Sequence, residues 1–203
     1  MLFFLVLGFL AALFIWIQFR SKRMAVGRNA KLKGKVAIER TLFTLQIGDV
    51  VQYEQRDWIL ETVYRYQQDK FEWVEYLLRD NDDAAWLVVV EDDWLEVSWL
   101  TPVPEDQLCI ELPPPRYIDH QGISYSLREK GEAKYSTEGR VNNQEGSCRF
   151  YDYQTKDGLQ LSLEEYDSAR DGGLDINVGR KINSLDLSLL PGDGKSVYAN
   201  VSR

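Results

Sequence analysis

The stretch Phe71–Glu91, FEWVEYLLRDNDDAAWLVVVE, indicates how the rest of the chain folds. It has two runs of aromatic and β-branched residues, one on each side of the acidic turn Asp80–Asp83. Residues of these types suit the pleated, half-buried surface of a sheet. Both runs carry apolar side chains on both faces, so the pattern predicts a β-hairpin in the middle of a sheet rather than at its edge.

Similar strand patterns lie on both sides of this hairpin. In the first half of the chain they cover residues 45–53, 58–66 and 94–100, and in the second half residues 122–127, 133–141, 147–154 and 159–166. Short strands with turns about every 8 to 12 residues are typical of small barrels and sandwiches. Prolines at 102, 104 and 113–115 separate the two halves, and because proline cannot donate to a ladder they indicate a rigid linker.

The two halves share an order of residues. Each contains an aromatic residue, an acid, a tyrosine, a turn, an apolar strand and a glutamate. The residues in this repeat are Trp73, Glu75, Tyr76, Trp86 and Glu91 in the first half, and Tyr151, Asp152, Tyr153 and Glu164 in the second. The repeat predicts two similar small β-subdomains packed together, with Trp73 and Trp86 in the core.

The N-terminal residues 2–17 form an unbroken run of apolar and small residues. This is close to the lower limit of about 17 to 25 residues for a membrane-spanning helix, and Trp16 lies where an interfacial aromatic residue belongs. A cleaved signal peptide would have a basic residue before the run and a small-residue cleavage site after it. The sequence has neither, and the basic segment 20–23 follows the run instead, so we expect a retained transmembrane helix.

Basic residues are concentrated directly after this run. Seven of the 24 basic residues precede the first acidic residue, Glu39, so the rest of the chain carries 17 basic and 32 acidic residues. Basic residues beside a span favour the cytoplasmic side, which predicts an N-terminus outside and a C-terminal body in the cytoplasm. The candidates for contact with an anionic lipid surface are Arg20, Lys22, Arg23, Arg28, Lys31, Lys33 and Lys35. The acidic body argues against nucleic-acid binding.

The expected fold class is all-β, with two similar small barrel- or sandwich-like β-subdomains after a single N-terminal transmembrane helix. The expected parts are a transmembrane anchor at 1–19, a basic juxtamembrane connector at 20–40, a first β-subdomain at 41–103, a Pro-rich linker at 104–116, a second β-subdomain at 117–192 and a tail at 193–203.

Few residues indicate a reaction. His120 is the only histidine and lies beside Asp119 in an expected exposed turn, and catalysis through it would need a second positioned partner. Cys109 and Cys148 form no Cys-x-x-Cys pair; they suit a reducing compartment and leave a single disulfide possible. The hairpin turn has alanines where a calcium loop needs a ligand and a glycine, and the sequence has no phosphate-binding glycine loop. We therefore expect no catalytic residue, no cofactor and no metal site.

Four acids stand within apolar strands: Glu75, Glu91, Asp152 and Glu164. Each can end a strand or accept a hydrogen bond from a neighbouring side chain. A paired-carboxylate catalytic site is the alternative, and it requires a cleft and shifted pKa values. The first interpretation favours a non-catalytic interaction module. The others are a carboxylate-dependent enzyme and a sensor that binds a small cationic ligand on its acidic surface.

Four motifs in this order resemble the bacterial family called domain of unknown function 4178. They are L-x-x-G-D-V-V-x-Y from Leu45, W-x-E-Y-L-L from Trp73, W-L-x-V-x-E from Trp86, and Y-D-Y from Tyr151 with the L-S-x-E-E that follows it. The resemblance covers about residues 41–192. It implies no catalytic residues and suggests a membrane or envelope setting. The expected function is therefore a membrane-anchored accessory or assembly subunit that binds a protein partner in a membrane-associated complex.

Overall fold

The computed structural model describes residues 39–104, 106–139, 143–167 and 174–193. The expected anchor at 1–19, the seven basic residues of the connector and nearly all of the expected tail lie outside these ranges. The part of the chain that is described contains no helix long and apolar enough to cross a membrane.

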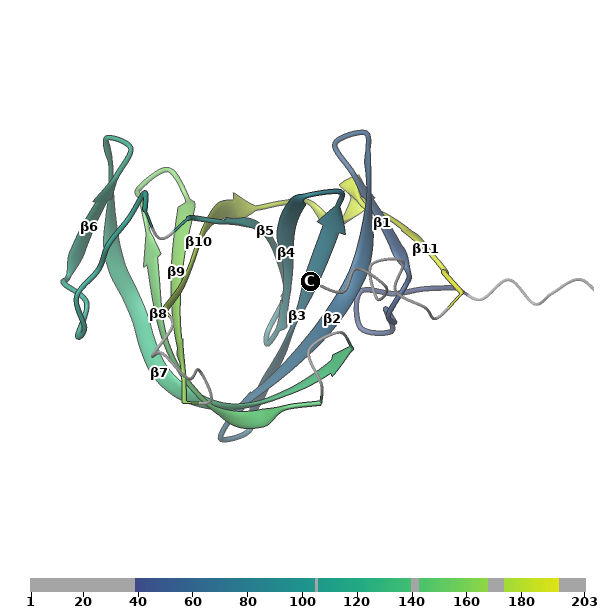
Figure 1. Ribbon diagram of the computed structural model, residues 1–203, viewed down its shortest axis with the longest axis horizontal. Helices are drawn as coiled ribbons and strands as arrows, with labels where there is room; N and C mark the ends of the chain where they lie inside the picture. The colour runs from purple at the N-terminus through teal and green to yellow at the C-terminus, as the bar shows by residue number, and fades with distance from the viewer. Residues whose placement is uncertain (1–38, 105, 140–142, 168–173, 194–203) are drawn as a thin grey trace, which may run out of the picture. The chain divides into compact units, whose positions relative to one another are not determined.

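Most of the described residues lie in strands and none in an α-helix, which confirms the all-β expectation (Figure 1). One antiparallel sheet contains all eleven strands. The strands are β1 (Val50–Tyr53), β2 (Arg56–Gln68), β3 (Phe71–Asp80), β4 (Asp83–Glu91), β5 (Leu95–Pro102), β6 (Tyr117–His120), β7 (Ile123–Gly139), β8 (Glu145–Gln154), β9 (Leu159–Tyr166), β10 (Leu174–Lys181) and β11 (Ser188–Leu190), with a short 3-10 helix, η1, at Ser184–Asp186.

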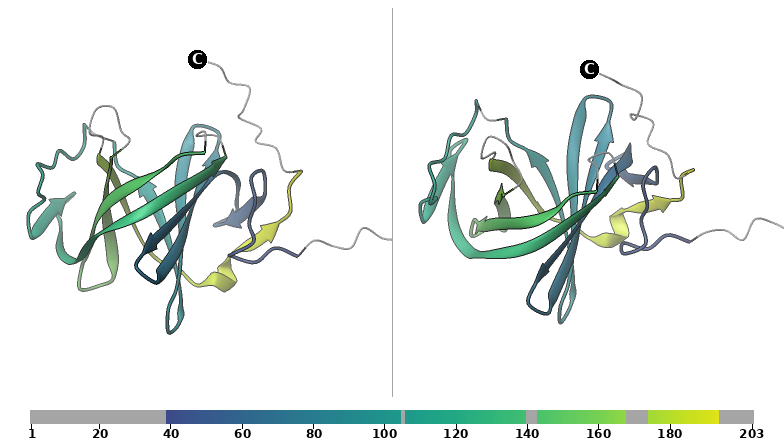
Figure 2. Two further views of the ribbon diagram at one scale, coloured as in Figure 1. Left: turned by 90° about the horizontal axis from the view of Figure 1, so that it is seen from below. Right: turned by 60° about the horizontal axis from the view of Figure 1, so that its bottom comes forward.

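Eight of these strands close into a ring. Their order is β2-β3-β4-β5-β10-β9-β8-β7, and β7 pairs back onto β2. β1 and β11 continue the sheet beside the first part of β2, and β6 does so beside the first part of β7. In Figures 1 and 2 the blue first half and the green second half face each other around the ring. The sequence predicted two small subdomains, whereas the strand order joins both halves in one sheet.

The two halves nevertheless repeat one strand order. β1–β5 and β6–β10 each consist of a short strand, a long strand and three further strands, joined in succession. Each half has a tyrosine in its third strand, Tyr76 in β3 and Tyr153 in β8. The hydroxyl of Tyr76 donates to the Leu42 carbonyl and that of Tyr153 to the Pro115 carbonyl, each at 2.7 Å. Each tyrosine thus fixes the segment that precedes its own half.

A pseudo-two-fold axis relates the halves. Their first hairpins match in register: Tyr53 pairs with Arg56 and His120 with Ile123, and the register then shifts between Leu60 and Thr62 in β2 and between Leu127 and Glu129 in β7. The two halves meet in the β5–β10 ladder, which is centred on the pair Leu100 and Gly179. The strands are very close here, because a Cβ on Gly179 would lie 2.0 Å from the carbonyl oxygen of Trp99.

Apolar side chains pack mainly on the outer face of the ring. In the first half, residues such as Leu87 and Val97 are covered by Leu42, Leu45 and the segment 182–189. In the second half, Leu161, Leu163 and Ile176 are covered by Val103 and by Leu108 and Ile110 from the linker. The interior is therefore left for other residue types, because neighbouring side chains on a strand point to opposite faces.

Asp49 joins the two ends of the body. Its side chain is fully buried and accepts hydrogen bonds from the backbone N–H of Gln46 at 2.8 Å and of Gly192 at 2.7 Å. The same carboxylate forms an ion pair with Arg40. One side chain thus holds the segment that enters β1 and the segment that leaves β11.

Candidate functional site

A cavity of about 320 Å³ lies inside the ring. Each of the eight ring strands contributes at least one side chain to its wall, so the wall is the inner face of the sheet. Its apolar part includes Phe71, Trp73, Val88, Leu100 and Phe150. The volume is at the lower end of the range typical of small-molecule sites.

Acids outnumber bases in this wall. The acids are Glu75, Glu96, Glu129, Asp152 and Glu164, and the bases are Arg128 and Lys181. Lys181 is paired with Glu96 at 2.5 Å. Within the described residues, no ion pair reaches Glu75, Asp152 or Glu164. The interior thus contains acidic groups that form no ion pair with another described residue.

Hydrogen bonds hold the buried carboxylates in place. Glu75 is 8% exposed and accepts from the indole N–H of Trp73 at 2.9 Å. Glu164 is 4% exposed and accepts from the hydroxyls of Tyr166 and, at 3.3 Å, Tyr66. Asp152 accepts from the Ser162 hydroxyl at 3.0 Å. Each carboxylate is therefore oriented by a neutral donor, which does not neutralise its charge.

Burial raises the pKa of all three acids. It raises the pKa of Glu164 to about 7 and that of Asp152 to about 6. The hydrogen bond from Tyr166 lowers the pKa of Glu164 in part, and the hydrogen bond from Ser162 does the same for Asp152. Burial also raises the pKa of Glu75 well above its usual range, and the nearby Glu164 raises it further. A buried carboxylate without a counter-charge is costly and takes up a proton or a cation.

Aromatic side chains form one part of the inner face. Tyr66 stacks on Trp73 with ring centroids 4.9 Å apart, and Trp73 meets Phe150 edge-on at 5.6 Å. Tyr135 and Tyr166 belong to the same group, with centroids 5.0 Å apart. Aromatic faces attract organic cations, so they and the carboxylates favour the same class of ligand.

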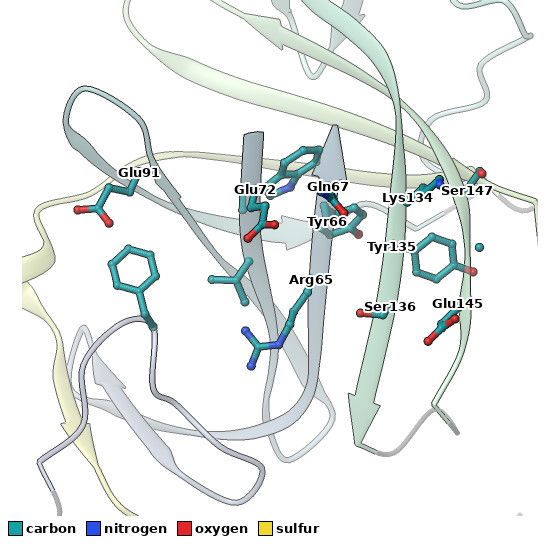
Figure 3. A pocket seen from close by; sticks show the side chains of 14 residues that line it. Arg65, Tyr66, Gln67, Glu72, Glu91, Lys134, Tyr135, Ser136, Glu145 and Ser147 are labelled. Carbon is teal, nitrogen blue, oxygen red and sulfur yellow. The ribbon is translucent and has the colours of Figure 1, made fainter. Parts of the chain in front are cut away.

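A larger groove of about 820 Å³ lies beside this aromatic group (Figure 3). It contains Arg65 and Lys134 as well as Glu72, Glu91 and Glu145. Figure 3 shows these charged side chains spread over neighbouring strands, not converging on one point. The groove has three acids against two bases and its charged groups are spread out, so the inner cavity is the better candidate site.

The structure divides the four strand acids identified in the sequence. Glu75, Asp152 and Glu164 line the inner cavity, whereas Glu91 is exposed at the end of β4. The sequence pattern placed Glu91 and Glu164 in equivalent positions. Trp73 pairs with Val90 and Phe150 with Glu164, so Val90, one residue before Glu91, lies on the cavity face as Glu164 does. A shift of one residue moves a side chain to the other face of a strand.

The remaining repeat residues lie on both faces of the sheet. Trp86 is buried, Trp73 is half-buried in the cavity wall, and Tyr151 is half-buried against the outer apolar cluster of the second half. The sequence analysis missed the hydrogen-bond partners Tyr66, Tyr166 and Ser162. The polar residues 160, 162, 164 and 166, which alternate with leucines in β9, were a signal for them.

The other candidates form no second site. His120 was expected in an exposed turn, but it is the last residue of β6 and is only 7% exposed, because the strand continues through it. Cys109 and Cys148 are both free. Across the described ranges, no group of three or more histidine, cysteine or acidic side chains could hold a metal ion. The turn acids Asp80 and Asp83 are paired with Arg56.

The fold and the site together define a ring-shaped all-β domain that encloses an acidic cavity. The model of a family called domain of unknown function (DUF4178) matches residues 46–184, and the chain belongs to this family. The resemblance drawn from the four motifs is therefore confirmed. The matched range contains every strand of the ring. A search of curated proteins and a search of solved structures each found no match.

Proposed function

We propose that this protein is a membrane-anchored, non-catalytic binding module whose ring takes up a small organic cation. The observation that carries the proposal is a set of three carboxylates, the buried Glu75 and Glu164 and the half-buried Asp152, which face one cavity without an ion pair from the described residues. An ammonium group that enters the cavity gains charge-assisted hydrogen bonds to oriented carboxylates. It also removes the cost of burying them unpaired. The sequence analysis gave a small cation on the acidic surface as an alternative; here we propose that the cation binds inside the ring.

A carboxylate-dependent enzyme has less support. Raised pKa values alone do not distinguish catalysis from ion-pair networks. The carboxylates are held by Trp73, Tyr66 and Tyr166, and Ser162, the hydroxyl nearest to Asp152, has no histidine beside it to act as a base, since His120 lies in β6. The contacts thus support binding more directly than turnover.

Thermal unfolding of the full-length protein in detergent tests the binding. Spermidine and 1,4-diaminobutane should raise the midpoint in a concentration-dependent way, because a ligand that binds only the folded state stabilises it by RT ln(1 + [L]/Kd). The uncharged 1,4-butanediol should leave the midpoint unchanged. No shift with either amine at millimolar concentration would contradict the proposal.

Two double variants with the same change in charge locate the binding. E75Q/E164Q removes two carboxylates from the cavity wall and should abolish the shift. D92N/D93N removes two exposed carboxylates from the β4–β5 turn and should retain it. A shift that survives the first double variant and is lost in the second would place the cation on the outer surface.

We also propose that residues 1–19 anchor the module with its body in the cytoplasm, as the basic flank of the apolar run favours. Protease added to right-side-out vesicles should leave residues 41–203 intact, whereas protease added to inverted vesicles should degrade or release them. The opposite pattern would place the body outside the cytoplasm.

We also propose that the tethered protein is an accessory subunit, for which the 65% exposed Trp94 offers a contact with a protein partner. Affinity purification from detergent-solubilised membranes, comparing the wild type with Trp94→Ala, tests that contact.

A further inference from the structure

Three aromatic rings meet at a corner of the inner cavity, and all three line it. Phe71 and Trp73 follow one another on the inner face of β3, with ring centroids 5.9 Å apart and planes tilted by 34°. Phe150 comes from β8, which β2 and β7 separate from β3 in the ring, and it meets Trp73 edge-on at 5.6 Å and 74°. Because the planes differ in direction, the rings form the walls of a corner, not a flat stack.

Neighbouring residues hold these rings in place. Tyr66 stacks on Trp73 at an interplanar angle of 4° and does not itself line the cavity, so the opposite face of the indole is the one that a ligand can meet. The indole N–H donates to Glu75 at 2.9 Å, which fixes the plane of the ring. Phe150 lies against Gly131 of β7, where a Cβ would come within 2.7 Å of the phenyl ring. The corner is therefore a preformed surface.

Two buried carboxylates border this corner. Glu75 is bonded to Trp73, and Glu164 is the cross-strand partner of Phe150, so its side chain starts beside the phenyl ring. Both carboxylates accept a hydrogen bond from a neutral side chain, and neither has an ion pair within the described residues. A positive charge can therefore be recognised at the corner without N–H groups of its own.

Aromatic faces beside a carboxylate suit one class of organic cation. In a methylated ammonium group the methyl groups carry part of the charge and contact ring faces directly, as in aromatic cages for quaternary ammonium ligands. A primary ammonium group is strongly hydrated and has three N–H donors that need acceptors. A ligand that also carried a negative group would bring it against the acids of the wall, which costs free energy.

We propose that the aromatic corner of Phe71, Trp73 and Phe150 binds the methyl groups of an N-methylated ammonium compound with a net positive charge. This inference rests on the proposed function and adds the class of cation. The rings recognise the methyl groups, and the carboxylates of Glu75 and Glu164 balance the charge.

Titration calorimetry on the full-length protein, in a maltoside detergent that carries no ammonium group, tests the proposal. The probes are ethanolamine, N,N-dimethylethanolamine and choline, which share one skeleton and one positive charge and differ in methyl groups. Affinity should rise along this series, and choline should bind about tenfold more tightly than ethanolamine. Affinity that stays level or falls with methylation would overturn the inference and leave the cation-binding function standing. Binding of none of the three would overturn both.

Two further probes identify the source of the methylated group. Glycine betaine and glycerophosphocholine carry the same trimethylammonium group as choline, together with a negative group. Both should bind about tenfold more weakly than choline, because their negative group faces the acids of the wall. If glycerophosphocholine bound as tightly as choline, the net positive charge would be overturned and a lipid headgroup would be the ligand. Equal binding of glycine betaine alone would overturn it in favour of a free zwitterion.

A pair of variants with the same change of side chain locates the contact. Phe71→Leu removes one ring of the corner and should lower the affinity for choline about three- to tenfold while leaving that for ethanolamine nearly unchanged. Phe43→Leu removes a 42% exposed ring from the outer groove and should change neither affinity. An equal loss for choline and ethanolamine in Phe71→Leu would overturn the contact with the methyl groups. The methylation series on the wild type decides the question even if a variant does not fold.

Discussion

Asp49→Asn is expected to lower the free energy of unfolding by about 3 to 5 kcal/mol, which is the range for breaking one side of a buried ion pair. The carboxylate is fully buried, forms an ion pair with Arg40 and accepts hydrogen bonds from the backbone N–H groups of Gln46 and Gly192. An asparagine presents an N–H₂ group to one of these three donors. That donor is left unsatisfied, and the charge that balances Arg40 is lost.

Urea denaturation of the full-length protein in detergent, followed by tryptophan fluorescence, measures the effect. Asp157→Asn is the matched control, because Asp157 is exposed in the β8–β9 turn and its replacement should change stability by less than about 0.5 kcal/mol. If both variants unfold at the wild-type midpoint, the contacts of Asp49 do not hold the ends of the body together.

Stability should fall as the pH rises from about 4 to about 7. Glu164 and Asp152 have pKa values of about 7 and about 6 in the folded protein, both above the ordinary values of carboxyl groups. Between the unfolded and folded pKa values the folded state binds more protons than the unfolded state, so raising the pH favours unfolding. One pKa unit corresponds to about 1.4 kcal/mol, so the raised pKa of Glu164, caused mainly by burial, accounts for a loss of about 3 kcal/mol.

Glu164→Gln isolates this contribution. A glutamine imitates the protonated carboxyl, so the variant should match the wild type at pH 4.5 and exceed its stability by about 3 kcal/mol at pH 7.5. Comparing the variant with the wild type at each pH removes the titration of other groups. One of these groups is Glu96, whose pKa is lowered by its hydrogen bond with Lys181. Its titration raises stability as the pH rises, whereas that of Glu164 lowers it. A variant that is less stable at both pH values would show that ionised Glu164 supports the fold.

The sequence predicts local strands better than their arrangement. The hairpin expected at 71–79 and 85–91 is observed as β3 and β4, because aromatic and β-branched residues flank a short acidic turn. β10 was missed, since the last strand pattern found in the sequence ends at residue 166. Its residues LDINVGRK include several poor strand formers. The strand exists because β5 and β9 pair with it on both sides, and these contacts are distant in the sequence.

The candidate site was predicted in part. Glu75, Asp152 and Glu164 stood out as acids within apolar strands, and all three line the cavity. Their common orientation could not be predicted, because it depends on closure of the ring by pairing between β2 and β7. Glu91 was grouped with them because alignment of short motifs does not fix the hairpin register, and one residue of register decides which face a side chain occupies.

Closure of the ring also constrains the order of folding during synthesis. The hairpins from β1 to β5 are local, but β2 and β5 find their second partners only in β7 and β10. A chain still on the ribosome therefore exposes the unpaired edges of two strands until about residue 181 has emerged. Such edges are prone to pairing with other chains, and contacts between distant residues form slowly. The step most exposed to misassembly is thus the interval between completion of the first half and arrival of the second.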